Sequence, residues 1–167
     1  PIMSECDWAF GLLSDRLVAH QRYMRIGRWG DNWDIVQHER NWPDLLKAKT
    51  RFCAFIYSNP VYYREAFFRA LSRYKRVDAP GPSMNNMAGI DPVPGTRDWG
   101  RKVEFLRQYK FVVAFENGSR AGYHTEKLLH AIEADCLPIY WGDPEIGDSY
   151  NAKRIVNAFD YLPRARR

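Results

Sequence analysis

Residues 51–74 read RFCAFIYSNPVYYREAFFRALSRY, and this stretch decides the fold. Its first part, residues 51–57, is an almost wholly apolar run, which is typical of a strand covered on both faces. The tripeptide Ser-Asn-Pro at 58–60 ends the run. Apolar side chains then recur at helical spacing as far as Tyr74. The pattern therefore predicts a buried strand followed by an amphipathic helix over residues 62–74.

The same alternation of strands and helices continues toward the C-terminus. It predicts a short strand at Val77, a helix from Asp98 to Tyr109, a strand over 111–115, a helix over 125–134, a strand over 137–141, a short turn or helix over 148–153 and a last strand at 155–156. Strands that alternate with helices favour a parallel sheet with helices on both faces. The predicted fold class is therefore α/β, with a Rossmann-like parallel sheet.

The first 50 residues have poor periodicity. A short strand is predicted near residues 7–11, and the aromatic and basic residues 22–29 are predicted to form a connecting segment. Residues 1–50 are interpreted as a linker and the remnant of another domain, and residues 51–167 as a Rossmann-like domain truncated at its C-terminus.

Composition bounds the class of protein. Of the 167 residues, 46% are hydrophobic and 15% aromatic, which excludes a disordered chain. The cysteines are odd in number and far apart, so they do not form a disulfide framework. Cys53 and Cys136 lie in apolar runs and are predicted to be small buried side chains in a reducing compartment. The net charge of +5 suits an anionic partner without identifying one.

One loop combines the features of an anion site. In parallel α/β sheets, ligands bind beyond the carboxyl ends of the strands, so the two loops over 58–60 and 116–124 matter most. The second loop leads into Thr125-Glu126-Lys127 at a predicted helix start, where free N–H groups favour phosphate. Lys127 opposes the helix dipole unless an anion lies above it, and Glu126 suits ribose hydroxyls. Taken alone, the tripeptide is better explained by a capped helix start with surface charges, because no general phosphate motif accompanies it.

A longer set of motifs decides between these interpretations. FEN at 115–117, GYHTEKL at 122–128 and LPIYWG at 137–142 follow one another in an order and spacing that resemble the alpha-1,3/1,4-fucosyltransferase family, in its bacterial branch. The segments at 52–71 and 151–160 are similar to the same family, and residues 7–11 and 22–25 more loosely so.

The resemblance implies the C-terminal half of a GT-B glycosyltransferase, in which two Rossmann-like domains face a cleft and residues 51–167 bind GDP-fucose. It implies transfer of L-fucose with inversion to an N-acetylglucosamine-type hydroxyl of a glycan such as N-acetyllactosamine. The implied partners are GDP or GDP-fucose and that glycan. A cytoplasmic location, or a peripheral one on the inner membrane of a bacterium, follows from the same resemblance.

The resemblance also assigns site residues. Arg64 and Lys127 are expected to hold the diphosphate, Glu126 the ribose, and Tyr123 and Asn117 the rest of the donor. Two cations and a helix N-terminus would stabilise the leaving diphosphate, so no metal and no further cofactor is expected. Three further residues are expected to take no part in catalysis. Asp143 and Glu145 are predicted to be solvated loop residues, and His124 is predicted to lie at the pocket edge or exposed.

The general base is the part of the site that the sequence does not supply. In the family this carboxylate comes from the N-terminal domain, and neither Glu5 nor Asp7 lies in the expected motif. The chain is therefore expected to bind the donor but to transfer fucose poorly by itself. The alternatives are a non-catalytic fragment that binds a GDP-sugar, and a GT-B transferase that uses another GDP-sugar.

Nucleic-acid binding is a third interpretation. Aromatic and basic residues interleave over 23–33 and 62–74, but those of the second stretch follow a helical apolar stripe, and no nucleic-acid-binding motif occurs. No nucleic-acid partner is expected.

Overall fold

The computed structural model describes residues 6–13, 15–26, 40–90 and 99–161. Its centre is a five-stranded sheet in which every neighbouring pair is parallel, in the order β4-β3-β5-β6-β7. The strands are β3 (Arg51–Ala54), β4 (Val77–Asp78), β5 (Tyr109–Phe115), β6 (Leu137–Trp141) and β7 (Val156–Asn157). The predicted parallel sheet is confirmed, and β5 is its central strand.

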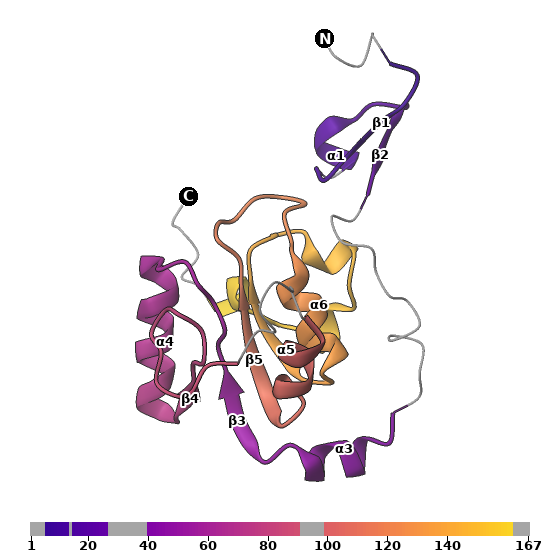
Figure 1. The fold of residues 1–167 in the computed structure, drawn as a ribbon. Helices are drawn as coiled ribbons and strands as arrows, with labels where there is room; N and C mark the ends of the chain where they lie inside the picture. Colours follow the sequence, from indigo (N-terminus) through magenta and orange to yellow (C-terminus); the bar gives the residue numbers. More distant parts are fainter. Residues whose placement is uncertain (1–5, 14, 27–39, 91–98, 162–167) are drawn as a thin grey trace.

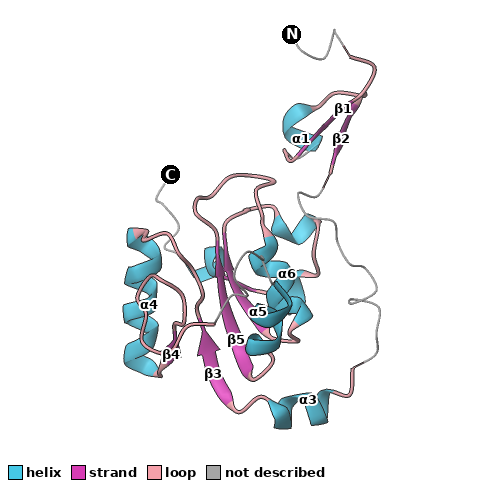
Figure 2. Cartoon of the chain, viewed as in Figure 1, coloured by secondary structure: helices cyan, strands magenta, loops and turns pink. Residues whose placement is uncertain are grey.

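Helices cover both faces of this sheet. Helix α4 (Tyr62–Tyr74) lies on one face, and α5 (Trp99–Leu106) and α6 (Glu126–Glu133) lie on the other (Figures 1 and 2). Alternate residues of β5 supply the two cores. Val113 and Phe115 pack with Phe68 of α4, whereas Val112 packs with Leu106 of α5. This period of two is the reason that β5 reads as a continuous apolar run.

The N-terminal region contains more regular structure than its sequence indicated. Strands β1 (Ala9–Gly11) and β2 (Tyr23–Arg25) pair in parallel, with the one-turn helix α1 (Asp15–Val18) between them. The strand expected near residues 7–11 is confirmed. The interpretation of residues 22–29 as a plain connecting segment is wrong at β2, whose hydrogen bonds come from β1. Figure 1 shows this β1-α1-β2 unit beyond the ends of β3 and β5 toward which those strands run.

Other boundaries shift slightly. Helix α3 (Trp42–Ala48) forms within the region predicted to be irregular, with a proline in its first turn. The strand predicted over 51–57 ends at Ala54, although the Phe55 N–H still donates to the Asp78 carbonyl at 2.9 Å. The segment predicted over 148–153 divides into two 3-10 helices, η2 (Ile146–Asp148) and η3 (Ala152–Arg154), and η4 (Ala158–Tyr161) follows β7. Asp98, the predicted N-cap, lies outside the described residues.

Cys53 and Cys136 are buried and carry free thiols, as predicted. Among the helices in the described ranges, none combines the length and the apolar character needed to cross a bilayer.

Candidate functional site

The candidate site lies where β5 ends and the loop over 116–124 leads into α6. Glu116, the first residue after β5, is fully buried. Its backbone N–H donates to the Trp141 carbonyl at 2.8 Å, which extends the pairing of β5 with β6 by one residue. The carboxylate is thereby held beneath the start of α6.

The Glu116 carboxylate is the shared hydrogen-bond acceptor for the polar groups at the start of α6. Oε1 accepts a hydrogen bond from the Thr125 backbone N–H at 2.7 Å, and Oε2 accepts one from Lys127 Nζ at 2.9 Å. The Thr125 hydroxyl lies within hydrogen-bond distance of both oxygens, at 2.9 and 2.8 Å. A buried carboxylate is stabilised by such charge-assisted donors. Sequence reasoning did not single out Glu116, although it is the middle residue of the FEN motif.

Thr125 is the N-cap residue of α6, as predicted, but its side chain does not cap the helix. The hydroxyl instead faces Glu116 and also accepts a hydrogen bond from Lys127 Nζ at 2.8 Å. In this structure the anion expected above Lys127 is therefore Glu116. An ammonium has three N–H groups, so a lysine bound to Glu116 and Thr125 can still donate to a further ligand.

Arg64 approaches the same strand end from α4. It is the third residue of that helix, it is 1% exposed, and its Nη2 donates to the Phe115 carbonyl. In the described part of the chain no carboxylate lies within 4 Å of its guanidinium, and its Nε–H has no hydrogen-bond partner. Burial lowers the pKa of Arg64. A buried cation without a carboxylate partner is energetically costly, and an anionic ligand would relieve that cost.

Glu126 begins α6 with a side chain that is 17% exposed. Burial acts to raise the pKa of this carboxyl, but the charges of Lys127 and Lys102 outweigh burial and hold the pKa below its usual value. Lys102 lies on α5, and burial lowers its pKa to about 8. Sequence reasoning missed Lys102 because a lysine on a predicted helix is ordinarily a solvated surface residue.

The remaining predicted residues belong to the loop. Asn117 is exposed and Tyr123 is half-buried. Tyr123 lies close enough to Arg64 for the two side chains to interact electrostatically. The structure thus brings Arg64, Tyr123, Glu126 and Lys127 to the end of β5, and leaves Asn117 at the outer side of the loop.

Two predictions about the rim of the site are wrong. Asp143 was expected to be solvated, but it is 0% exposed. His124 was expected at the pocket edge or exposed, and the exposed alternative is wrong, because it is 6% exposed with Nδ1 lying 3.6 Å from Asp143 Oδ2. Both are buried because the loop over 116–124 folds back over the segment that follows β6.

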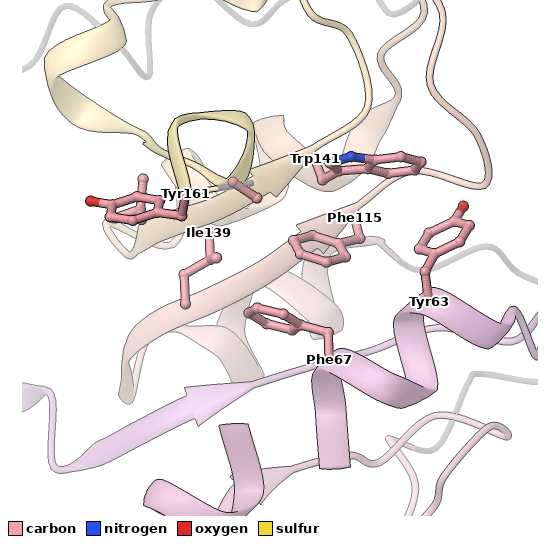
Figure 3. A pocket seen from close by; sticks show the side chains of 8 residues that line it. Tyr63, Phe67, Phe115, Ile139, Trp141 and Tyr161 are labelled. Atoms are coloured by element: carbon pink, nitrogen blue, oxygen red, sulfur yellow. The ribbon is translucent and has the colours of Figure 1, made fainter. Parts of the chain in front are cut away.

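An apolar cavity of about 630 Å³ adjoins the site on the α4 face of the sheet. In Figure 3, Tyr63 and Phe67 project from α4 toward Trp141 and Phe115, with ring centroids 4.5 Å apart for Tyr63–Trp141 and 4.6 Å for Phe67–Phe115. An aromatic wall therefore lies behind the site. It includes Tyr63, Phe115 and Trp141, which directly precede the residues 64, 116 and 142 in the sequence. The cavity is lined by Tyr63, Phe67, Phe115, Ile139, Trp141, Val156, Ala158 and Tyr161.

Within the ranges that the structure describes, no three His, Cys, Asp or Glu side chains gather in a way that could hold a metal ion.

The fold is that of a Rossmann-like domain, and its candidate ligand site lies at the carboxyl end of its central strand. Residues 46–161 match the family model described as glycosyltransferase family 10 (fucosyltransferase), C-terminal part, and the chain belongs to this family. The predicted family and the predicted Rossmann-like parallel sheet are thereby confirmed.

Individual relatives agree with the family. The alpha-(1,3)-fucosyltransferase of Helicobacter pylori is 39% identical over 114 residues, which cover 68% of this chain and 22% of that protein. The GDP-fucose protein O-fucosyltransferase 3 of Bos taurus is 34% identical over 109 residues, which cover 62% of this chain and 23% of that protein. The chain thus spans roughly a fifth of the length of the curated relatives it matches.

Solved structures agree as well. A crystal structure of an alpha-1,3-fucosyltransferase with GDP-fucose superposes with a TM-score of 0.67 at 28% identity, covering 94% of this chain and 54% of that one. The same comparison with a crystal structure of an alpha-1,3-fucosyltransferase bound to GDP gives a TM-score of 0.70.

Proposed function

We propose that this chain forms the donor-binding half of an inverting fucosyltransferase, which transfers L-fucose from GDP-fucose to an N-acetylglucosamine-type hydroxyl of a glycan. The observation that carries the proposal is the convergence of two cations on the end of β5. Arg64 comes from α4 and Lys127 from α6, and they contact the adjacent residues Phe115 and Glu116. Two of the solved relatives are described as complexes with GDP-fucose and with GDP, which supports the same ligand for this chain.

The chemistry of the transfer suits this arrangement. When the glycosidic bond to fucose breaks, positive charge develops on the sugar ring and negative charge on the departing GDP. Arg64, Lys127 and the N-terminus of α6 would stabilise the diphosphate by preorganised charge. We propose that they do so without a metal or a further cofactor. The Arg64 guanidinium carries five N–H groups, so while Nη2 donates to the Phe115 carbonyl, other N–H groups, among them Nε–H, can donate to a ligand.

The other residues would fix the donor. Glu126 remains ionised under the influence of Lys127 and Lys102, so its carboxylate can accept hydrogen bonds from ribose hydroxyls. Tyr123 and Asn117 belong to the loop that borders the site, and we propose that they contact the rest of the donor.

We further propose that the general base is supplied from outside residues 6–161. The Glu116 carboxylate is already occupied by Thr125 and Lys127, and Glu126 is assigned to the ribose. A base must be free to take the proton of the acceptor hydroxyl. The same observation supports a second candidate function, in which the chain binds a GDP-sugar without catalysing transfer. For the whole protein we propose a cytoplasmic location, or a peripheral one on the inner membrane of a bacterium, and this proposal rests on the resemblance to the bacterial branch of the family.

Titration calorimetry with GDP tests the donor site. Lys127→Ala should weaken binding about tenfold or more, because a charge-assisted hydrogen bond to phosphate is lost. Arg64→Lys should also weaken binding, because lysine lacks the fork of donors. Lys47→Ala is the matched control, since this lysine is 79% exposed on α3. Equal affinity of the Lys127→Ala, Lys47→Ala and unaltered chains would contradict the site.

A further inference from the structure

The β1-α1-β2 unit contacts the loop over 116–124 at a position where there is no room for a side chain. Gly122 has a φ of +79°, and a Cβ atom at this position would lie 1.8 Å from the Leu12 carbonyl oxygen. The backbone of the loop therefore packs directly against the segment between β1 and α1. Gly122 is needed both for its left-handed conformation and for this close approach.

The Asp143 carboxylate connects the loop over 116–124 with the β1-α1-β2 unit. Oδ1 accepts hydrogen bonds from the backbone N–H groups of Gly122 and Glu145, both at 2.9 Å. Oδ2 lies 3.0 Å from Arg25 Nη2 at the end of β2, and 3.6 Å from His124 Nδ1. Three stretches of chain that are far apart in sequence thus meet at one fully buried carboxylate.

The ion pair in this cluster is shielded from water. The Arg25 side chain is 14% exposed and that of Asp143 is 0% exposed. Burial acts to raise the pKa of Asp143, but His124, the two backbone N–H groups and Arg25 together hold it below the usual value. The carboxylate is therefore charged at neutral pH, and removal of Arg25 would leave a buried charge short of a partner.

We propose that Arg25 and Asp143 are positioning residues of the donor site. Through Gly122 they lock the loop over 116–124 against the β1-α1-β2 unit, and so fix the orientation of the adjacent Tyr123. The N-terminal unit is then a structural part of the donor site. This inference rests on the proposed function, in which Tyr123 contacts the donor.

Arg25→Gln is the test variant, because glutamine keeps polarity and part of the length but removes the charge. The matched control is Arg16→Gln. Arg16 lies in the same unit and pairs with Asp148 at 3.5 Å, but its side chain is 76% exposed, so loss of its ion pair should have little effect. Both variants are made in the full 167-residue chain.

Hydrogen exchange measures the lock without any ligand. The Gly122 amide should exchange about tenfold faster or more in Arg25→Gln, as expected for a lost hydrogen bond to a charged group, and at the original rate in Arg16→Gln. Unchanged exchange in Arg25→Gln, or equal acceleration in both variants, would overturn the proposal.

GDP calorimetry then measures the consequence for the site. Arg25→Gln should bind GDP several-fold more weakly at a temperature where circular dichroism shows the variant still folded, and Arg25→Lys should recover part of the affinity. Faster exchange combined with undiminished GDP affinity would show a purely structural contact and overturn the positioning role. Failure of the unaltered chain to bind GDP would instead contradict the proposed function, and the exchange comparison would remain valid.

Discussion

Gly142, the first residue after β6, shows how one missing side chain shapes the site. A Cβ atom here would lie 2.5 Å from Cγ and 2.8 Å from Cβ of Glu116. The glycine therefore provides the space in which the Glu116 side chain turns toward Thr125 and Lys127. The motif LPIYWG is visible in the sequence, but its final glycine is explained only by the contact with Glu116, which follows the neighbouring strand.

Gly142→Ala should consequently destabilise the chain by about 1 to 3 kcal/mol, which is the usual cost of overpacking a filled interior. It should also weaken GDP binding, because displacement of Glu116 moves Lys127. Urea unfolding gives the stability and calorimetry the affinity. Gly118→Ala is the control, because a Cβ atom there would meet no heavy atom within 4 Å. Equal stability of the two variants would argue against the contact.

At the scale of the elements, Lys49 connects two helices to the start of the sheet. It lies between α3 and β3 and is 4% exposed. Its Nζ donates to the Arg107 carbonyl at 3.0 Å and to the Ala134 carbonyl at 2.8 Å, the residues that follow α5 and α6 respectively. A cation at two helix C-termini satisfies free carbonyls and opposes the negative ends of both dipoles.

Replacement of Lys49 by Met should therefore destabilise the chain by roughly 2 to 3 kcal/mol, because two carbonyls lose their donor while the aliphatic volume remains. Chemical unfolding in urea measures the loss. Lys47→Met, two residues away on the exposed side of α3, should stay within about 0.5 kcal/mol of the unaltered chain. A Lys49→Met variant as stable as Lys47→Met would show that the helix ends do not depend on this side chain.

The boundaries of the elements show what local pattern can predict. Helix α4 begins and ends where its apolar stripe predicts, after the Ser-Asn-Pro turn. Strand β2 was missed because its three residues, Tyr23 to Arg25, have no strand pattern long enough to stand out and depend on pairing with β1. Short strands are defined by their partners, whereas a 13-residue amphipathic helix defines itself.

For the whole molecule, His130 links stability to pH. Burial, with a contribution from the charge of Lys102, lowers its pKa from 6.5 to about 4. The folded protein therefore keeps this imidazole neutral at pH values where the unfolded chain already binds a proton. Because the unfolded state binds more protons between about pH 6.5 and 4, stability falls as the pH decreases through that interval.

We expect the free energy of unfolding to decrease by on the order of 2 kcal/mol between pH 6.5 and 4.5 through His130 alone. Urea unfolding at a series of pH values measures it. His130→Gln should have a visibly shallower dependence, because its side chain does not titrate. Below about pH 4 a further loss should follow in both proteins as Asp143 and Asp78, whose pKa values are held low in the folded state, become protonated. The same slope in both proteins between pH 6.5 and 4.5 would contradict the role of His130.

The sequence by itself determined the alternation of strands and helices from residue 51 onward, the parallel sheet and the family. The physical reason is that long periodic segments such as 51–74 and 109–115 carry their burial pattern in consecutive residues. The resemblance to the family also assigns five residues to the donor site, and these assignments stay predictions until binding is measured: Arg64, Asn117, Tyr123, Glu126 and Lys127.

Only the tertiary structure decided which charged residues are buried and what they contact. Glu116 and Asp143 resemble ordinary loop carboxylates in the sequence, yet both are fully buried. Their donors come from distant segments: Lys127 lies 11 residues from Glu116, and Arg25 lies 118 residues from Asp143. A charge can be buried only where the folded chain brings donors around it, and no local pattern records those partners.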